Sequence, residues 1–145
     1  MEPVALIISP HPDDAEIAMG GTIAALLQQG TRVVVADLSN GEPTPHGSVE
    51  KRKAESAAAS DILGIKERRL LTLKNREIFD TVHNRGIVAS LIPELRPTIL
   101  FGPYWDDVHP DHVQAAALVE SARFYAKFVK SDLPHEPWYP RKHLH

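Results

Sequence analysis

The chain has 145 residues, 43% of them hydrophobic and 24% charged, which fits one globular domain with a buried core. Its net charge of -3 gives no basic field, so neither nucleic acid nor an anionic membrane is expected as a partner. The sequence contains no cysteine, so any metal must be bound by histidines and carboxylates. No membrane span or secretory signal is recognisable, and a cytoplasmic location is expected.

Four apolar segments rich in β-branched residues are predicted strands: Val4–Ser9, Arg32–Leu38, Arg68–Leu73 and Thr98–Pro103. Four segments have the length of helices and carry residues typical of helix ends: Ile17–Gln29, Val49–Leu63, Ile78–Leu95 and Pro110–Lys130. Glycine follows the first two helices, at Gly30 and Gly64, where a helix commonly ends. Because strands and helices alternate, and the strands are apolar throughout, the sequence predicts a parallel, doubly wound α/β sheet with both faces covered.

Two polar motifs follow two of the predicted strands. The sequence SPHPDD follows the first strand, and YWDDVHPDH follows the fourth. In a sheet of order 3-2-1-4 these two strand ends are neighbours on either side of the point where strand order reverses, which is where ligands bind in such folds. The motifs are therefore expected to share one crevice although about a hundred residues separate them.

The residue types in these motifs suit a catalytic zinc site. Two imidazoles and one carboxylate, from His11, Asp14 and His112, make a common set that leaves a position open for water. Asp13 is placed to act as the general base. His109 is a candidate for stabilising an oxyanion or protonating a leaving group, and Asp111 for orienting the His109 ring. Imidazole and carboxylate ligands also accept Fe²⁺, Co²⁺ or Mn²⁺.

Simpler interpretations exist for each motif alone. Aspartates at the start of a helix favour the helix dipole, and HPDH fits proline in a first helical turn with polar caps. Both motifs falling at adjacent strand ends favours the metal site. The remaining histidines are most simply surface residues: His46, His83, His135, His143 and His145.

The segments PHPDDAEIAMGGT and HPDHVQAA resemble the two hallmark motifs of the LmbE-like/PIG-L family of zinc-dependent N-deacetylases. The segments DLSNGEPTPHGSVEKRKAESAAASDILGI and LRPTILFGPYWDDVHPDH are also similar to that family, so the resemblance covers nearly the whole chain. It implies a Rossmann-like, three-layer α/β/α fold with a mostly parallel sheet. It also implies hydrolysis of the acetamide of an N-acetylglucosamine-containing small molecule.

The resemblance also implies roles for individual residues. His11, Asp14 and His112 would bind Zn²⁺, Asp13 would be the general base, and His109 the charge-stabilising acid with Asp111 as its partner. Arg52 matches an arginine that contacts sugar hydroxyls, and Asp107 matches an acidic residue that contacts substrate.

Family members are usually longer, with a C-terminal part that adds strands and pocket residues. We therefore expect residues 1–145 to form a single LmbE-like deacetylase domain that lacks part of that region. On this expectation the chain is a truncated product, or another subunit of a homo-oligomer completes the pocket. Three alternatives stay open: a hydrolase of another amide or ester, a non-catalytic metal-dependent sugar-binding module, and a nucleotide-binding domain, which would lack its glycine motif.

Overall fold

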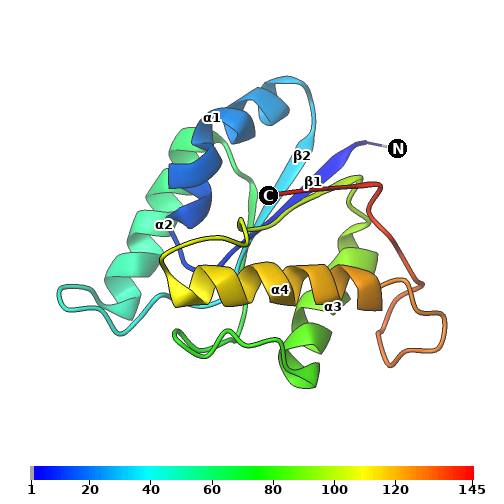
Figure 1. Cartoon of the computed structure of the whole chain (residues 1–145). Helices are drawn as coiled ribbons and strands as arrows, with labels where there is room; N and C mark the ends of the chain where they lie inside the picture. Colours follow the sequence, from blue (N-terminus) through cyan, green and yellow to red (C-terminus); the bar gives the residue numbers. More distant parts are fainter. Residues whose placement is uncertain (1) are drawn as a thin grey trace.

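The computed structural model describes residues 2–145, which form a five-stranded parallel sheet between two layers of helices (Figure 1). The strands are β1 (Val4–Ser9), β2 (Arg32–Asp37), β3 (Glu67–Leu70), β4 (Ile99–Phe101) and β5 (Lys142–Leu144). Their order across the sheet is β3-β2-β1-β4-β5, and every neighbouring pair is parallel. The predicted α/β fold is confirmed, and β1 and β4 are neighbours.

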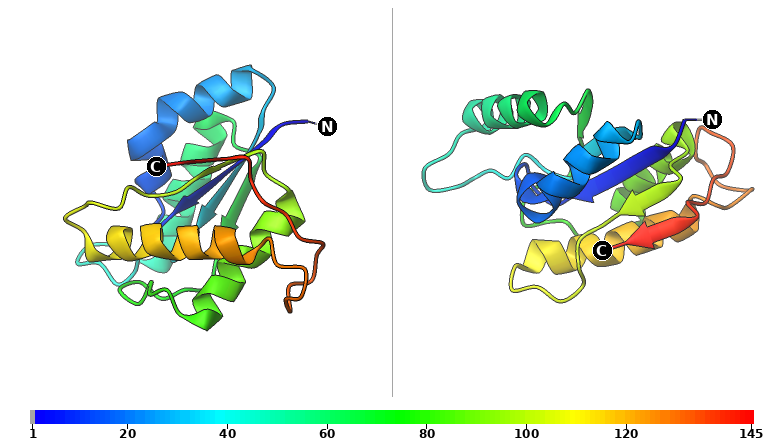
Figure 2. Two further views of the ribbon diagram at one scale, coloured as in Figure 1. Left: turned by 45° about the vertical axis from the view of Figure 1, so that its right-hand side comes forward. Right: turned by 90° about the horizontal axis from the view of Figure 1, so that it is seen from above.

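Helices cover both faces of the sheet, as the two views in Figure 2 show. They are α1 (Asp14–Gln28), α2 (Val49–Leu63), α3 (Val82–Leu95) and α4 (Pro110–Tyr125). Alternate residues of β1 point to opposite faces, so Leu6 and Ile8 pack with α3 and α4, whereas Ala5 and Ile7 pack with α1. This two-sided burial explains why the strand sequences are apolar throughout.

Local signals set several helix ends. The side chain of Ser48 accepts a hydrogen bond from the backbone N–H of Lys51 and caps α2. Gly64 ends the same helix in the left-handed region at φ 81°, where a residue without a Cβ is favoured. The predicted bounds of α2 are confirmed.

Other predicted boundaries differ from the structure. Helix α1 begins at Asp14 rather than Ile17, with Asp13 as its N-cap residue. Helix α3 begins at Val82 rather than Ile78, because the Thr81 side chain caps it by accepting from the N–H of Asn84. Helix α4 ends at Tyr125 rather than Lys130, and the second, third and fourth strands end earlier than predicted.

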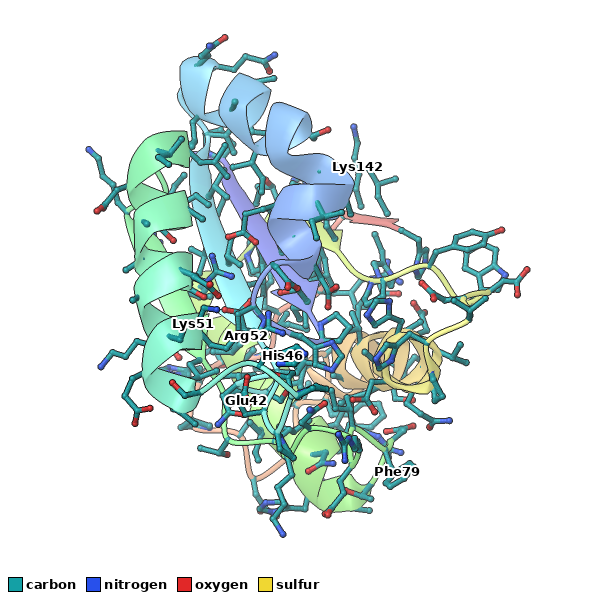
Figure 3. All side chains as sticks on the ribbon, turned by 90° about the vertical axis from the view of Figure 1, so that its left-hand side faces the viewer. Glu42, His46, Lys51, Arg52, Phe79 and Lys142 are labelled. Atoms are coloured by element: carbon teal, nitrogen blue, oxygen red, sulfur yellow. The ribbon has the colours of Figure 1, made fainter. Side chains whose placement is uncertain are left out.

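The segment after α4 returns to the sheet as β5, a strand that the sequence did not predict. It runs parallel to β4 at the edge, with Lys142 paired with Ile99 (Lys142 is labelled in Figure 3). The expectation that His143 is a surface residue was wrong, since its side chain is 5% exposed. Three residues are too few to show a hydrophobic period, which is why the pattern missed them. Within residues 2–145, no helix has the length and apolar character needed to cross a membrane.

Candidate active site

The candidate site lies at the carboxyl ends of β1 and β4, where the chain leaves the sheet in two directions. After β1 it enters α1 on one face, and after β4 it enters α4 on the other (Figures 1 and 2). The two loops therefore separate and leave a crevice between them, the usual ligand position in open parallel sheets. The two predicted motifs line this crevice.

Two of the predicted side chains, His11 and His112, converge on one carboxylate oxygen of a third, Asp14. The Oδ2 atom of Asp14 lies 3.2 Å from Nδ1 of His11 and 3.3 Å from Nε2 of His112. The backbone N–H of His11 also donates to this oxygen, at 3.0 Å. Although the two histidines come from different ends of the chain, the structure places both rings around the first residue of α1.

Each of these two rings has a second carboxylate on its other nitrogen. The Oδ2 atom of Asp111 lies 2.9 Å from Nε2 of His11, and Oδ2 of Asp107 lies 3.0 Å from Nδ1 of His112. Asp111 is only 4% exposed, and it also accepts the backbone N–H of Arg76 at 2.8 Å. These carboxylates fix each ring's orientation and favour a tautomer whose remaining nitrogen faces Asp14.

The charges of the site shift several pKa values. Burial lowers the pKa of His11, but hydrogen bonds and charge from Asp14 and Asp111 outweigh it and raise the pKa above its ordinary value. Burial raises the pKa of Asp14, but contacts with His11 and His112 lower it overall. The hydrogen bond from the backbone of His109, together with contact with His112, lowers the pKa of Asp107. Ionised carboxylates around imidazoles make the crevice attractive to a cation.

Asp13 occupies a strained backbone position beside this cluster. Its φ of 114° lies in the region that side-chain-bearing residues rarely adopt, and its carboxylate is turned away from that of Asp14 toward α2. There Nη1 of Arg52 lies 2.7 Å from Oδ2 of Asp13 and donates to the carbonyl of Pro12 at 3.2 Å. Glu42 lies 3.5 Å from Nε of Arg52, and Figure 3 labels both residues, Arg52 near the start of α2 and Glu42 in the loop that precedes this helix. Such strain is frequent at functional sites.

The expected contact between the carboxylate of Asp111 and the ring of His109 was wrong. The Asp111 carboxylate instead contacts His11, because it points from the first turn of α4 into the interior. Asp111 meets His109 through its backbone N–H, which donates to Nδ1 of the His109 ring at 3.1 Å. An accepting Nδ1 leaves the proton of a neutral ring on Nε2. Nitrogens of His109, His11 and His112 lie within 4.8 Å of one another.

Two residues that take part in the site, Glu42 and Arg76, were not predicted from the sequence. Glu42 lies in the long loop after β2, and that loop's length was the available signal for a ligand-bordering segment. Arg76 contributes its backbone N–H from a left-handed conformation at φ 70°, which side-chain chemistry does not reveal. A cavity of about 540 Å³ opens beside the cluster, with walls that include Asp14, Tyr104 and His112.

Comparisons with known proteins identify the family to which the chain belongs. The profile of the PIG-L family, described as GlcNAc-PI de-N-acetylase, matches residues 6–123. The diacetylchitobiose deacetylase of Thermococcus kodakarensis is 34% identical over 88% of this chain and 53% of its own length. The 1D-myo-inositol 2-acetamido-2-deoxy-alpha-D-glucopyranoside deacetylase of Kribbella flavida is 28% identical over 92% of this chain and 60% of its own.

The crystal structure of the conserved protein TT1542 from Thermus thermophilus superposes with a TM-score of 0.92 and 35% identity, over 99% of this chain and 64% of that one. The chain thus spans between about half and two thirds of the length of the relatives it matches. The profile match over most of the chain, together with this identity, shows that the chain belongs to the PIG-L, or LmbE-like, family.

Proposed function

We propose that the chain is the catalytic region of a metal-dependent hydrolase that removes the acetyl group from an N-acetylglucosamine-containing small molecule. The observation that carries the proposal is the convergence of His11 and His112 on Asp14. Membership in the PIG-L family supports it, as do relatives named as deacetylases of acetylated glucosamine compounds.

The donor set fits a zinc ion. His11, Asp14 and His112 would bind it, because both rings turn one nitrogen toward Asp14 while a carboxylate occupies the other nitrogen. His109 is less suited as a ligand, since its neutral ring carries the proton on Nε2 and has no free lone pair there. Fe²⁺ and other divalent ions suit the same ligands. A bound zinc ion would supply Lewis-acid chemistry, polarising a carbonyl and lowering the pKa of a water molecule.

Asp13 is the proposed general base. Its carboxylate is adjacent in sequence to the ligand Asp14 but points elsewhere, so it can accept a proton without occupying a ligand position. Arg52 holds this carboxylate through Nη1 and limits its rotation. The proton taken from the attacking water would reside on a carboxylate oxygen of Asp13 until the leaving amine takes it.

His109 is the proposed stabiliser of the tetrahedral oxyanion. Its Nε2–H is the free donor of the ring, because Nδ1 accepts the backbone N–H of Asp111. A fixed donor aimed at developing negative charge lowers the barrier without reorganising during the reaction. Asp111 is a positioning residue in this scheme, acting on His11 through its carboxylate and on His109 through its backbone.

Arg52 and Asp107 are proposed to contact the sugar. Both border the crevice. Arg52 has a further donor in Nη2 beyond the atoms that contact Pro12, Asp13 and Glu42, and the Asp107 oxygens that contact His109 and His112 can each accept a second hydrogen bond. The expected single domain over residues 1–145 and a cytoplasmic location stay predictions, as does a homo-oligomer.

The test is acetate release from N-acetylglucosamine conjugates by protein that is stripped with a chelator and then reloaded with Zn²⁺. Release that disappears with the chelator and returns with zinc supports the proposal. D13A should lose turnover by about 100- to 10,000-fold while it keeps its bound metal. Stoichiometric metal binding without acetate release would favour the non-catalytic sugar-binding module. Hydrolysis of other amides or esters, without acetate release from the sugar conjugates, would favour a hydrolase with a different substrate.

A further inference from the structure

A second group of metal-binding side chains lies outside the candidate active site, between α4 and β5. Glu120 comes from the middle of α4, whereas His143 and His145 are two residues apart on β5 and its end, on one face of the strand. One ligand atom from each of the three residues lies within 4.8 Å of the others. The two imidazole centroids are 4.3 Å apart.

His143 is buried in a space shaped for its ring. Its side chain is 5% exposed, and its Nδ1 atom lies 2.7 Å from Oε2 of Glu120. Gly102 makes room for the ring, since a Cβ at that position would come within 3.2 Å of Nε2. This Nε2 atom is buried and has no hydrogen-bond partner within residues 2–145. The two ring nitrogens point away from each other, so an ion shared with Glu120 would be bound through Nδ1 of His143.

His145 has the tautomer that a metal ligand requires. Its Nδ1 atom lies 2.8 Å from the backbone carbonyl oxygen of Pro103. Because a carbonyl oxygen can only accept, Nδ1 carries the proton and Nε2 keeps a free lone pair. Histidine ligands of metals commonly hold their second nitrogen in this way.

We propose that Glu120, His143 and His145 form a second metal site, specific for a transition-metal dication of the Zn²⁺ class. Two imidazoles and one carboxylate suit such an ion better than Mg²⁺ or Ca²⁺, which prefer oxygen ligands. The site is separate from the one formed by His11, Asp14 and His112, and it does not depend on the proposed catalytic activity.

The bound ion would fasten β5 to the rest of the fold. Backbone pairing joins β5 to β4 within the sheet. A metal ligated from both α4 and β5 would join the edge of the sheet to the helix layer. His145 also lines the 540 Å³ cavity whose walls include Asp14 and His112, so the ion would stabilise one wall of that cavity.

The test is zinc binding by the chelator-stripped chain, measured by equilibrium dialysis against buffered Zn²⁺. The wild type is expected to bind about two zinc ions per chain, one for each site. The variants E120Q and H145Q should bind about one, and both change exposed residues, which protects against loss of folding. H135Q removes an exposed histidine outside both groups and should still bind about two.

A second measurement isolates the proposed site. In D14A, which removes a ligand of the first site, Zn²⁺ should still raise Tm, because an ion that binds only the folded chain stabilises it. Adding E120Q to D14A should abolish that rise. The proposal is overturned if the wild type binds one zinc ion and neither E120Q nor H145Q changes that number, or if H135Q lowers it as much as H145Q does.

Discussion

The Nη1 atom of Arg52 lies 2.7 Å from Oδ2 of Asp13, and this contact joins α2 to the loop after β1. The two residues are 39 positions apart, on α2 and at the N-cap of α1. The same guanidinium reaches the carbonyl of Pro12 and lies near Glu42, so it fixes both the loop after β1 and the proposed base. The arrangement indicates that Arg52 positions Asp13, in addition to its proposed contact with the sugar.

We expect R52M to lower kcat by about 100-fold, because a base that loses its fixed position no longer meets the attacking water in the reactive geometry. The kcat of R52K should lie between those of R52M and wild type, since lysine keeps the charge but not the planar set of donors. Steady-state acetate release gives kcat, and metal analysis should show unchanged zinc content. A rise in KM with unchanged kcat would assign Arg52 to substrate binding alone.

Asp111 should control metal affinity through His11. In D111N the amide oxygen can still accept the N–H of Arg76, but the charged acceptor for Nε2 of His11 is lost. We expect zinc to bind about 10- to 100-fold more weakly, as when other carboxylate partners of metal-binding histidines are removed. Competition with a chelator measures the affinity. D106N changes an exposed acid of the loop before α4 and should leave the affinity unchanged; equal affinities in D111N and wild type would contradict the assignment.

Arg68 should be important for stability rather than for chemistry. It donates from Nε to Asp37 at 2.6 Å and also pairs with Glu16, and all three side chains are largely buried. R68M leaves two carboxylates without their partner, which should cost about 3 to 5 kcal/mol of unfolding free energy. Urea unfolding measures this loss. R141M, at an exposed arginine, is the matched control, and a loss below about 1 kcal/mol for R68M would show that the carboxylates find other partners.

Gly86 offers a stabilising substitution. It lies inside α3, and an added Cβ would meet no atom within 4 Å. G86A should therefore raise the unfolding free energy by about 1 kcal/mol, since alanine loses less backbone entropy in a helix. G64A is the contrasting variant, because Gly64 ends α2 at φ 81° and alanine would be strained there. Thermal unfolding should show opposite shifts; equal shifts would contradict this reading of the backbone.

The sequence by itself determined the fold class, most element positions and the two motifs of the site. These properties depend on local information: apolar runs without alternation mark buried strands, and caps such as Ser48 and Gly64 mark helix ends. The metal-binding role of His11, Asp14 and His112 stays a prediction, and it could be made because residue types alone restrict which metals they suit.

Only the tertiary structure decided which carboxylate serves which ring. Asp111 contacts His11, which lies 100 positions earlier in the sequence. Its closeness in sequence to His109 suggested the His109 ring as its partner instead. The backbone N–H of Arg76, the fixing of Asp13 by Arg52 and the burial of His143 were equally inaccessible. Each depends on how separate loops leave the sheet and meet, which follows from packing between elements and has no periodic signal within any one of them.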